Sequence, residues 1–158
     1  MGPFVKGAEV LPYLIDRFNP NFILSSTIGG DAKFSGILNN LISVKEFKNE
    51  INCEVIDLQC LIPFDISKNI IKSIQKTNRL MIIDEDVPGG ASSYILQELL
   101  NNQDIYQFLD SEPKLVTAKE HRPPYGSDGD YISKPSFEDI FDEIYNIMRE
   151  SNPHRFKK

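Results

Sequence analysis

An almost continuously apolar strand segment most limits how this chain can fold. Residues 80–84 read Leu-Met-Ile-Ile-Asp, and a short run without polar alternation is typical of a parallel strand that is covered on both faces. The apolar segments 22–28, 53–58 and 114–118 predict three further strands. These four segments alternate with segments of helical periodicity.

Four helices are expected: at residues 32–47, from Asp65 to Ile74, from the residue after Gly90 to Leu100, and from about Phe137 to Glu150. Asp31 and Asp65 are placed as N-caps of the first two helices, and Ser136 with Asp139 forms a capping-box pattern before the last. The alternation of strands and helices predicts an α/β fold of three layers, an open and mostly parallel sheet with helices on both faces.

The length of 158 residues predicts one domain. We expect residues 1–20 to be a leader or linker, residues 21–152 to form the domain, and residues 153–158 to be an extended basic tail. The stretch 121–131 contains two prolines and two glycines, so we expect it to be irregular.

The sequence indicates neither a targeting segment nor a disulfide or metal cross-link. No run of 18 or more apolar residues occurs, and the N-terminus lacks the basic region and long apolar stretch of a signal peptide, so a soluble, cytoplasmic protein is expected. Cys53 and Cys60 lie seven residues apart, which fits neither zinc spacing nor a redox motif. We expect both to be buried, reduced thiols.

The charge is unevenly distributed. Residues 84–150 carry 15 acidic and five basic side chains, whereas the rest of the chain is close to neutral or basic. An acidic surface repels the phosphates of nucleic acids and anionic membranes and favours a basic protein partner. A merely solvated acidic face that keeps the domain soluble is the alternative.

Loops that follow strands are where ligands bind to such sheets, but no catalytic, cofactor or metal site can be assembled there. Gly29-Gly30 and Gly89-Gly90 do not spell a nucleotide-binding motif, although the second pair could offer N–H groups to an anion or form a tight turn. Adjacent side chains in Asp84-Glu85-Asp86 point to opposite faces and should not converge on one ion. For His121 and Arg122 we favour a structural or interface role, since no nucleophile stands in a recognisable motif.

Four segments in order resemble a known family: residues 53–65, Cys-Glu-Val-Ile-Asp-Leu-Gln-Cys-Leu-Ile-Pro-Phe-Asp; residues 82–86 with Gly89-Gly90; residues 107–110, Gln-Phe-Leu-Asp, with Val116-Thr117; and Pro124-Tyr125. Together they resemble the C-terminal, transketolase-like domain of the beta subunit of thiamine-diphosphate-dependent 2-oxoacid dehydrogenases. The stretch from His121 to Pro135 also resembles fused alpha-beta forms of 2-oxoisovalerate dehydrogenases.

This resemblance implies a noncatalytic domain of the decarboxylase component in a multienzyme complex. The parent enzyme would cleave a 2-oxoacid, 2-oxoisovalerate or pyruvate, with thiamine diphosphate and magnesium, and transfer the acyl group to lipoyl. The cofactor and the catalytic histidines would lie in other domains or an alpha subunit. Implied partners are the rest of the decarboxylase component, a homologous domain in a dimer, and the basic subunit-binding domain of the lipoyl acyltransferase.

The resemblance also suggests a docking site. Asp110 matches a position that faces the acyltransferase in related beta subunits, although Ser111-Glu112 lengthens the link to Pro113. The candidate docking residues are Asp110, Glu112, His121, Arg122 and Tyr125. The matching domain of a transketolase or of a 2-oxoacid ferredoxin oxidoreductase, and a stand-alone α/β small-molecule-binding protein, are the alternatives.

Overall fold

A four-stranded parallel sheet forms the centre of the computed structural model, which describes residues 23–26, 51, 53–58, 60–122, 124–126 and 129–157. The strands are β1 (Ile23–Ser26), β2 (Glu54–Asp57), β3 (Leu80–Ile83) and β4 (Lys114–Val116), in the order β2-β1-β3-β4. Every pair of neighbouring strands is parallel. The four predicted strands are therefore present, and β2, β3 and β4 are each shorter than the apolar segment that predicts them.

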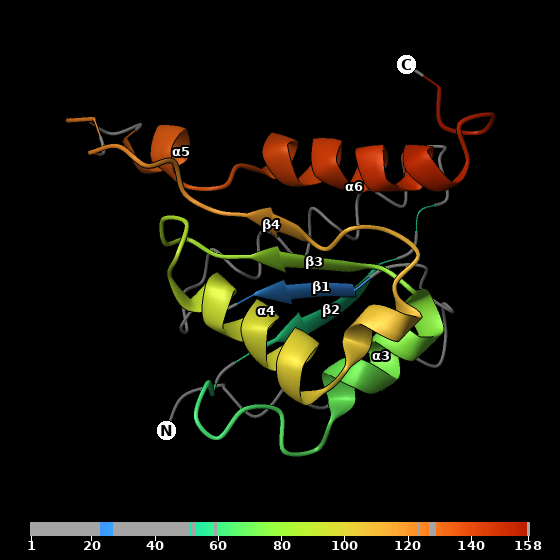
Figure 1. Cartoon of the computed structure of the whole chain (residues 1–158). Helices are drawn as coiled ribbons and strands as arrows, with labels where there is room; N and C mark the ends of the chain where they lie inside the picture. The colour runs from blue at the N-terminus through green and yellow to red at the C-terminus, as the bar shows by residue number, and fades with distance from the viewer. Residues whose placement is uncertain are drawn as a thin grey trace, which may run out of the picture.

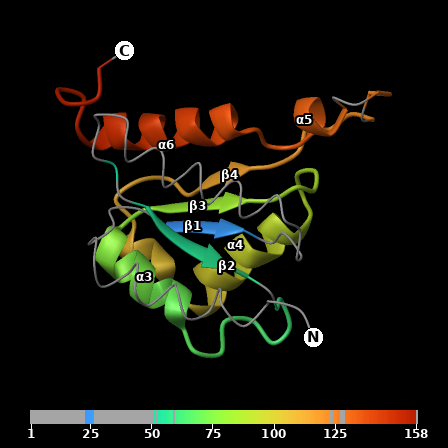
Figure 2. The same cartoon turned by 180° about the vertical axis from the view of Figure 1, so that it is seen from behind.

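Strand β3 explains why the sheet is covered on both faces. All four of its residues are buried, and because strand side chains alternate, they enter two separate cores. Met81 and Ile83 pack in a cluster with residues of helix α6 (Phe137–Ser151). Leu80 and Ile82 pack in a cluster with residues of helices α3 (Asn69–Thr77) and α4 (Ala91–Asn102). Figures 1 and 2 show α6 on one side of the sheet and α3 with α4 on the other. The predicted three-layer α/β fold is confirmed.

Helix α3 (Asn69–Thr77) begins later than the sequence indicates. The N-cap position is Lys68 and not Asp65 as expected, but the Asp65 carboxylate still accepts the N–H groups of Asn69 and Ile70 in the first turn, at 2.9 and 3.1 Å. The backbone between Asp65 and Asn69 is not helical: Lys68 has a φ of 52°, and Ile66 is exposed. The expectation that Ile66 belongs to the helix was wrong.

The other helices are α4 (Ala91–Asn102), the short 3-10 helix η1 (Ile105–Phe108), α5 (Gly129–Ser133) and α6 (Phe137–Ser151). The capping box of α6 is confirmed, since the Ser136 hydroxyl accepts the Asp139 N–H and the Asp139 carboxylate accepts the Ser136 N–H. Helix α5 corrects the expectation of an irregular stretch up to residue 131, because its first three residues already form a helical turn.

The C-terminal tail is not extended, contrary to the sequence-based expectation. After α6 the N–H groups of Arg155 and Phe156 donate to the carbonyl of Asn152, which turns the chain back. Phe156 is 2% exposed and joins the core beneath α6, where its ring meets that of Tyr145 edge to face. Burial of this one aromatic ring stabilises the folded-back tail even though the neighbouring residues are polar.

Some expectations fall on residues outside those described. They are the leader at 1–20, the helix at 32–47 with Asp31, and the Gly29-Gly30 loop. Within the described ranges, no helix is long and apolar enough to cross a membrane.

Candidate functional site

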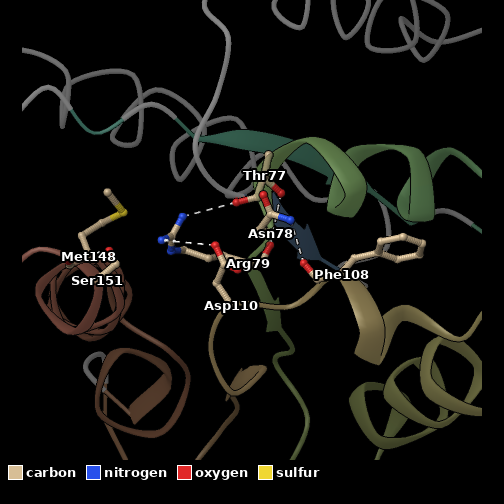
Figure 3. Close-up of polar contacts among 7 residues, drawn as sticks. All are labelled: Thr77, Asn78, Arg79, Phe108, Asp110, Met148 and Ser151. Carbon is tan, nitrogen blue, oxygen red and sulfur yellow. Dashed lines mark hydrogen bonds and ion pairs between the residues drawn. The ribbon is translucent and has the colours of Figure 1, made fainter.

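The amino-terminal edge of the sheet is organised by Asn78, which sequence analysis did not single out. Asn78 follows α3 in a left-handed conformation, φ 60°, and its N–H donates to the Ile74 carbonyl, a common way for Asn to end a helix. Its side-chain amide donates to the Phe108 carbonyl, and its own carbonyl accepts the Asp110 N–H, both at 2.8 Å. These two bonds fix the link between η1 and β4 against the start of β3 (Figure 3).

The link brings Asp110 to Arg79. One carboxylate oxygen of Asp110, Oδ2, lies 4.0 Å from Nη2 of Arg79, and the two side chains are 63% and 15% exposed. The other terminal nitrogen of Arg79 donates to the Thr77 carbonyl at 3.4 Å. Figure 3 shows the side chain of Arg79, the residue before β3, extending in the direction of α6, with Asp110 and Thr77 on its two sides.

Glu112 lies just beyond Asp110 but is already paired. Its carboxylate accepts a hydrogen bond from the Lys114 ammonium at 2.9 Å. That hydrogen bond is the main reason why the pKa of Lys114 is raised above its ordinary value. Of these two exposed carboxylates, Asp110 therefore carries the less neutralised charge.

The remaining docking candidates lie at the opposite end of β4. His121, Arg122 and Tyr125 follow this strand and are all exposed, whereas Asp110 and Glu112 precede it. The Arg122 guanidinium donates to the Tyr125 hydroxyl and stands 4.9 Å from the centre of its ring. The five candidates therefore form two groups, one acidic and one cationic with an aromatic side chain, and they do not make one continuous site.

The carboxyl-terminal edge of the sheet is closed by the buried carboxylate of Asp84. It accepts the N–H groups of Asp86 and Ser92 at 3.1 and 2.8 Å, so the first turn of α4 already holds an anionic group from within the chain. A Cβ on Gly90 would come within 2.9 Å of the Asp86 carboxylate. Of the two interpretations of Gly89-Gly90, the tight turn is therefore favoured over an anion site.

A shallow hollow of about 430 Å³ adjoins this turn; it is lined by Leu61, Asp84, Glu85, Asp86, Ala91 and Lys134. Three carboxylates and one ammonium disfavour a phosphate ligand, and the ammonium of Lys134 is 3.0 Å from Glu85. The described residues contain no group of three or more His, Cys, Asp or Glu side chains that could hold a metal ion. Nothing in the described donor set fits magnesium or thiamine diphosphate, so we derive no catalytic step from it.

The two cysteines differ more than the sequence indicates. Both are free. Cys53 is partly buried, and burial raises the pKa of its thiol to about 12. Cys60 is exposed, and its thiol donates to the Ile62 carbonyl. The expectation that both thiols are buried was wrong for Cys60, which lies in the loop between β2 and α3.

The parallel sheet, the helices on both faces and the polar loops at its two edges define an α/β domain of the three-layer class. Comparison with known families assigns it further: residues 41–133 match the transketolase C-terminal domain. Since the match covers more than half of the chain, the protein belongs to this family.

Curated relatives agree with the assignment. The chain is 29% identical over 104 residues to a pyruvate dehydrogenase E1 component subunit beta of Rickettsia conorii, a match that covers 63% of this chain and 30% of the relative. It is 34% identical over 95 residues to the protein of the same name from Mesostigma viride, covering 60% of this chain and 28% of the relative. The chain thus spans less than a third of the length of these relatives.

Proposed function

We propose that this chain is the noncatalytic C-terminal domain of the decarboxylase component of a 2-oxoacid dehydrogenase. The observation that carries the proposal is the match to E1 beta subunits over about 30% of their length, together with the transketolase C-terminal domain family. Oxidative decarboxylation and acyl transfer to lipoyl would belong to the parent enzyme in the cytoplasm, with thiamine diphosphate and magnesium bound outside this chain.

Pyruvate is the substrate that we propose for the parent enzyme. The names of the relatives favour it over 2-oxoisovalerate. The loop after β4, whose resemblance to fused 2-oxoisovalerate dehydrogenases favours the other substrate, lies on the surface and has exposed His121 and Arg122 side chains. A surface loop of this kind need not touch the substrate, so it carries less weight.

The amino-terminal edge of the sheet, where Asp110 and Glu112 lie, is the surface that we propose for docking the basic subunit-binding domain of the lipoyl acyltransferase. Asp110 supports this role because its carboxylate is largely exposed while its backbone is held in place by Asn78. A fixed charge at the rim of an interface increases the association rate and selects partners of opposite charge. Glu112, paired with Lys114, would add a weaker contribution.

The group at the other end of β4 would contact a different partner. Tyr125 is 86% exposed, and aromatic and arginine side chains are enriched where protein interfaces form. We propose that His121, Arg122 and Tyr125 face the rest of the decarboxylase component or the homologous domain of a dimer.

Three measurements test this proposal. Calorimetric titration of the chain with thiamine diphosphate and Mg²⁺, and turnover assays with pyruvate and 2-oxoisovalerate, should show neither binding nor activity; turnover by this chain alone would contradict the proposal. Binding of the acyltransferase subunit-binding domain should be sensitive to salt and should weaken in Asp110→Lys.

The control for charge is Asp142→Lys, which makes the same change at an exposed position on α6 and should leave the affinity nearly unaltered. If Asp110→Lys binds as well as the unmodified chain, Asp110 is not part of the docking surface.

A further inference from the structure

Arg79 is a cation with few partners. A guanidinium has five N–H donors, yet Nη1 of Arg79 makes only a long hydrogen bond to Thr77, and its buried Nε has no hydrogen-bond partner among the described residues. The Asp110 carboxylate, 4.0 Å away, is its ion-pair partner. Since the described residues do not satisfy all of its N–H donors, the positive charge of Arg79 acts mainly on Asp110 among the described carboxylates.

Asp110 cannot easily move away from this cation. Its N–H is bonded to Asn78, the residue directly before Arg79, and the amide of Asn78 also holds Phe108. The backbone of Asp110 is therefore held beside that of Arg79, although the Asp110 side chain itself is 63% exposed. At 4.0 Å the ion pair is too long for a hydrogen bond, so the lone pairs of the Asp110 carboxylate stay open to a second cation.

We propose that Arg79 is an internal counter-ion that limits how strongly Asp110 attracts a basic partner, and so a specificity-determining residue of the docking surface. The inference rests on the proposed docking function. A cation that approaches the open side of Asp110 must share the carboxylate with Arg79 and is repelled by the like charge behind it. The charge at position 79 then sets the affinity for the partner.

Removal of that charge should tighten binding. The affinity of Arg79→Gln for the acyltransferase subunit-binding domain should rise by about 2- to 5-fold, the range that corresponds to an exposed ion pair. Arg79→Lys keeps the charge and should bind like the unmodified chain. Lys72→Gln removes one positive charge on α3, where Lys72 donates to the Ser67 carbonyl, and should change the affinity much less.

The mechanism predicts coupling between the two residues. Asp110→Asn should weaken binding by up to about 5-fold, and Arg79→Gln should give no gain when it is added to Asp110→Asn. Because the Asp110 carboxylate is largely exposed, the gain should also shrink as the salt concentration rises.

The experiment is isothermal titration calorimetry of the full 158-residue chain and its variants with the subunit-binding domain at low and high salt. A gain in Arg79→Gln that disappears in the double variant supports the proposal. If Asp110→Asn weakens binding while Arg79→Gln does not tighten it, or if Arg79→Lys tightens it equally, the role of Arg79 is overturned and docking at Asp110 stands. If Asp110→Asn binds normally, docking at Asp110 fails and the role of Arg79 fails with it.

Discussion

The carboxylate of Asp84 accepts the backbone N–H of Ser92 at 2.8 Å and joins the end of β3 to the first turn of α4. Asp84 is 2% exposed, and its carboxylate also accepts the N–H of Asp86. A hydrogen-bonded carboxylate from the chain itself therefore occupies the position where many α/β proteins bind phosphate. Asp84, at this edge of the sheet, therefore has a structural role.

Replacement of Asp84 should destabilise the domain. Asp84→Ala removes the acceptor of the buried Ser92 N–H and of the partly buried Asp86 N–H, and the free energy of unfolding should fall by about 2 to 4 kcal/mol. Urea denaturation followed by circular dichroism measures the change. Glu85→Gln, at the neighbouring exposed position, should cost less than about 1 kcal/mol; equal losses in the two variants would contradict the role of Asp84.

The capping box of α6 should make stability depend on pH. The hydrogen bond from the Ser136 hydroxyl, followed by that from the Ser136 N–H, lowers the pKa of Asp139. A carboxylate with a lowered pKa stabilises the folded state above its unfolded pKa, about 3.9, and this contribution disappears as the pH falls through the lower folded value.

At pH 7 the variant Asp139→Asn should therefore be less stable than the unmodified chain. The difference between their unfolding free energies, measured from pH 7 to pH 2.5, should decrease only below about pH 4. A difference that is constant over this range would show that the charge of Asp139 does not contribute.

Phe156 should anchor the C-terminal tail. Phe156→Ala removes a buried aromatic ring from the core under α6 and should lower the free energy of unfolding by about 3 to 5 kcal/mol. His154→Ala, in the same turn but exposed, should have little effect. An extended, unanchored tail would make both substitutions neutral.

The two thiols should react at different rates. Cys60 is exposed, whereas the Cys53 thiol has a pKa of about 12 and forms almost no thiolate at pH 8. Ellman's reagent should therefore modify one thiol per chain quickly, and the second only after denaturation. Cys60→Ser should remove the fast phase, and a fast phase that persists in this variant would contradict the burial of Cys53.

Local patterns in the sequence predict most of the strands and helices of the fold. The uninterrupted apolar run at 80–83 identifies the central strand, and the Ser136 and Asp139 spacing identifies the start of α6, because each depends on residues that are close in the sequence. The start of α3 was predicted less well, because the Asp65 carboxylate reaches over a non-helical segment to bond the first turn.

The arrangement of the candidate site depends on distant contacts and could not be predicted in the same way. The side-chain amide of Asn78 donates a hydrogen bond to the carbonyl of Phe108, 30 residues away. No local sequence pattern predicts such a long-range hydrogen bond. The pairing of Arg79 with Asp110 follows from it. The lone Phe156 within a basic tail was a signal of burial that sequence analysis did not use.

The most direct test of the central claim is to purify the chain, tagged at its own gene, from the cells that make it. We expect it to be recovered with the other parts of a 2-oxoacid decarboxylase component, in the same polypeptide or as bound subunits. The lipoyl acyltransferase should be recovered too, and the purified material should oxidise pyruvate. Recovery as a free 18.0 kDa protein, with no decarboxylase component by mass spectrometry and no pyruvate oxidation, would contradict the account.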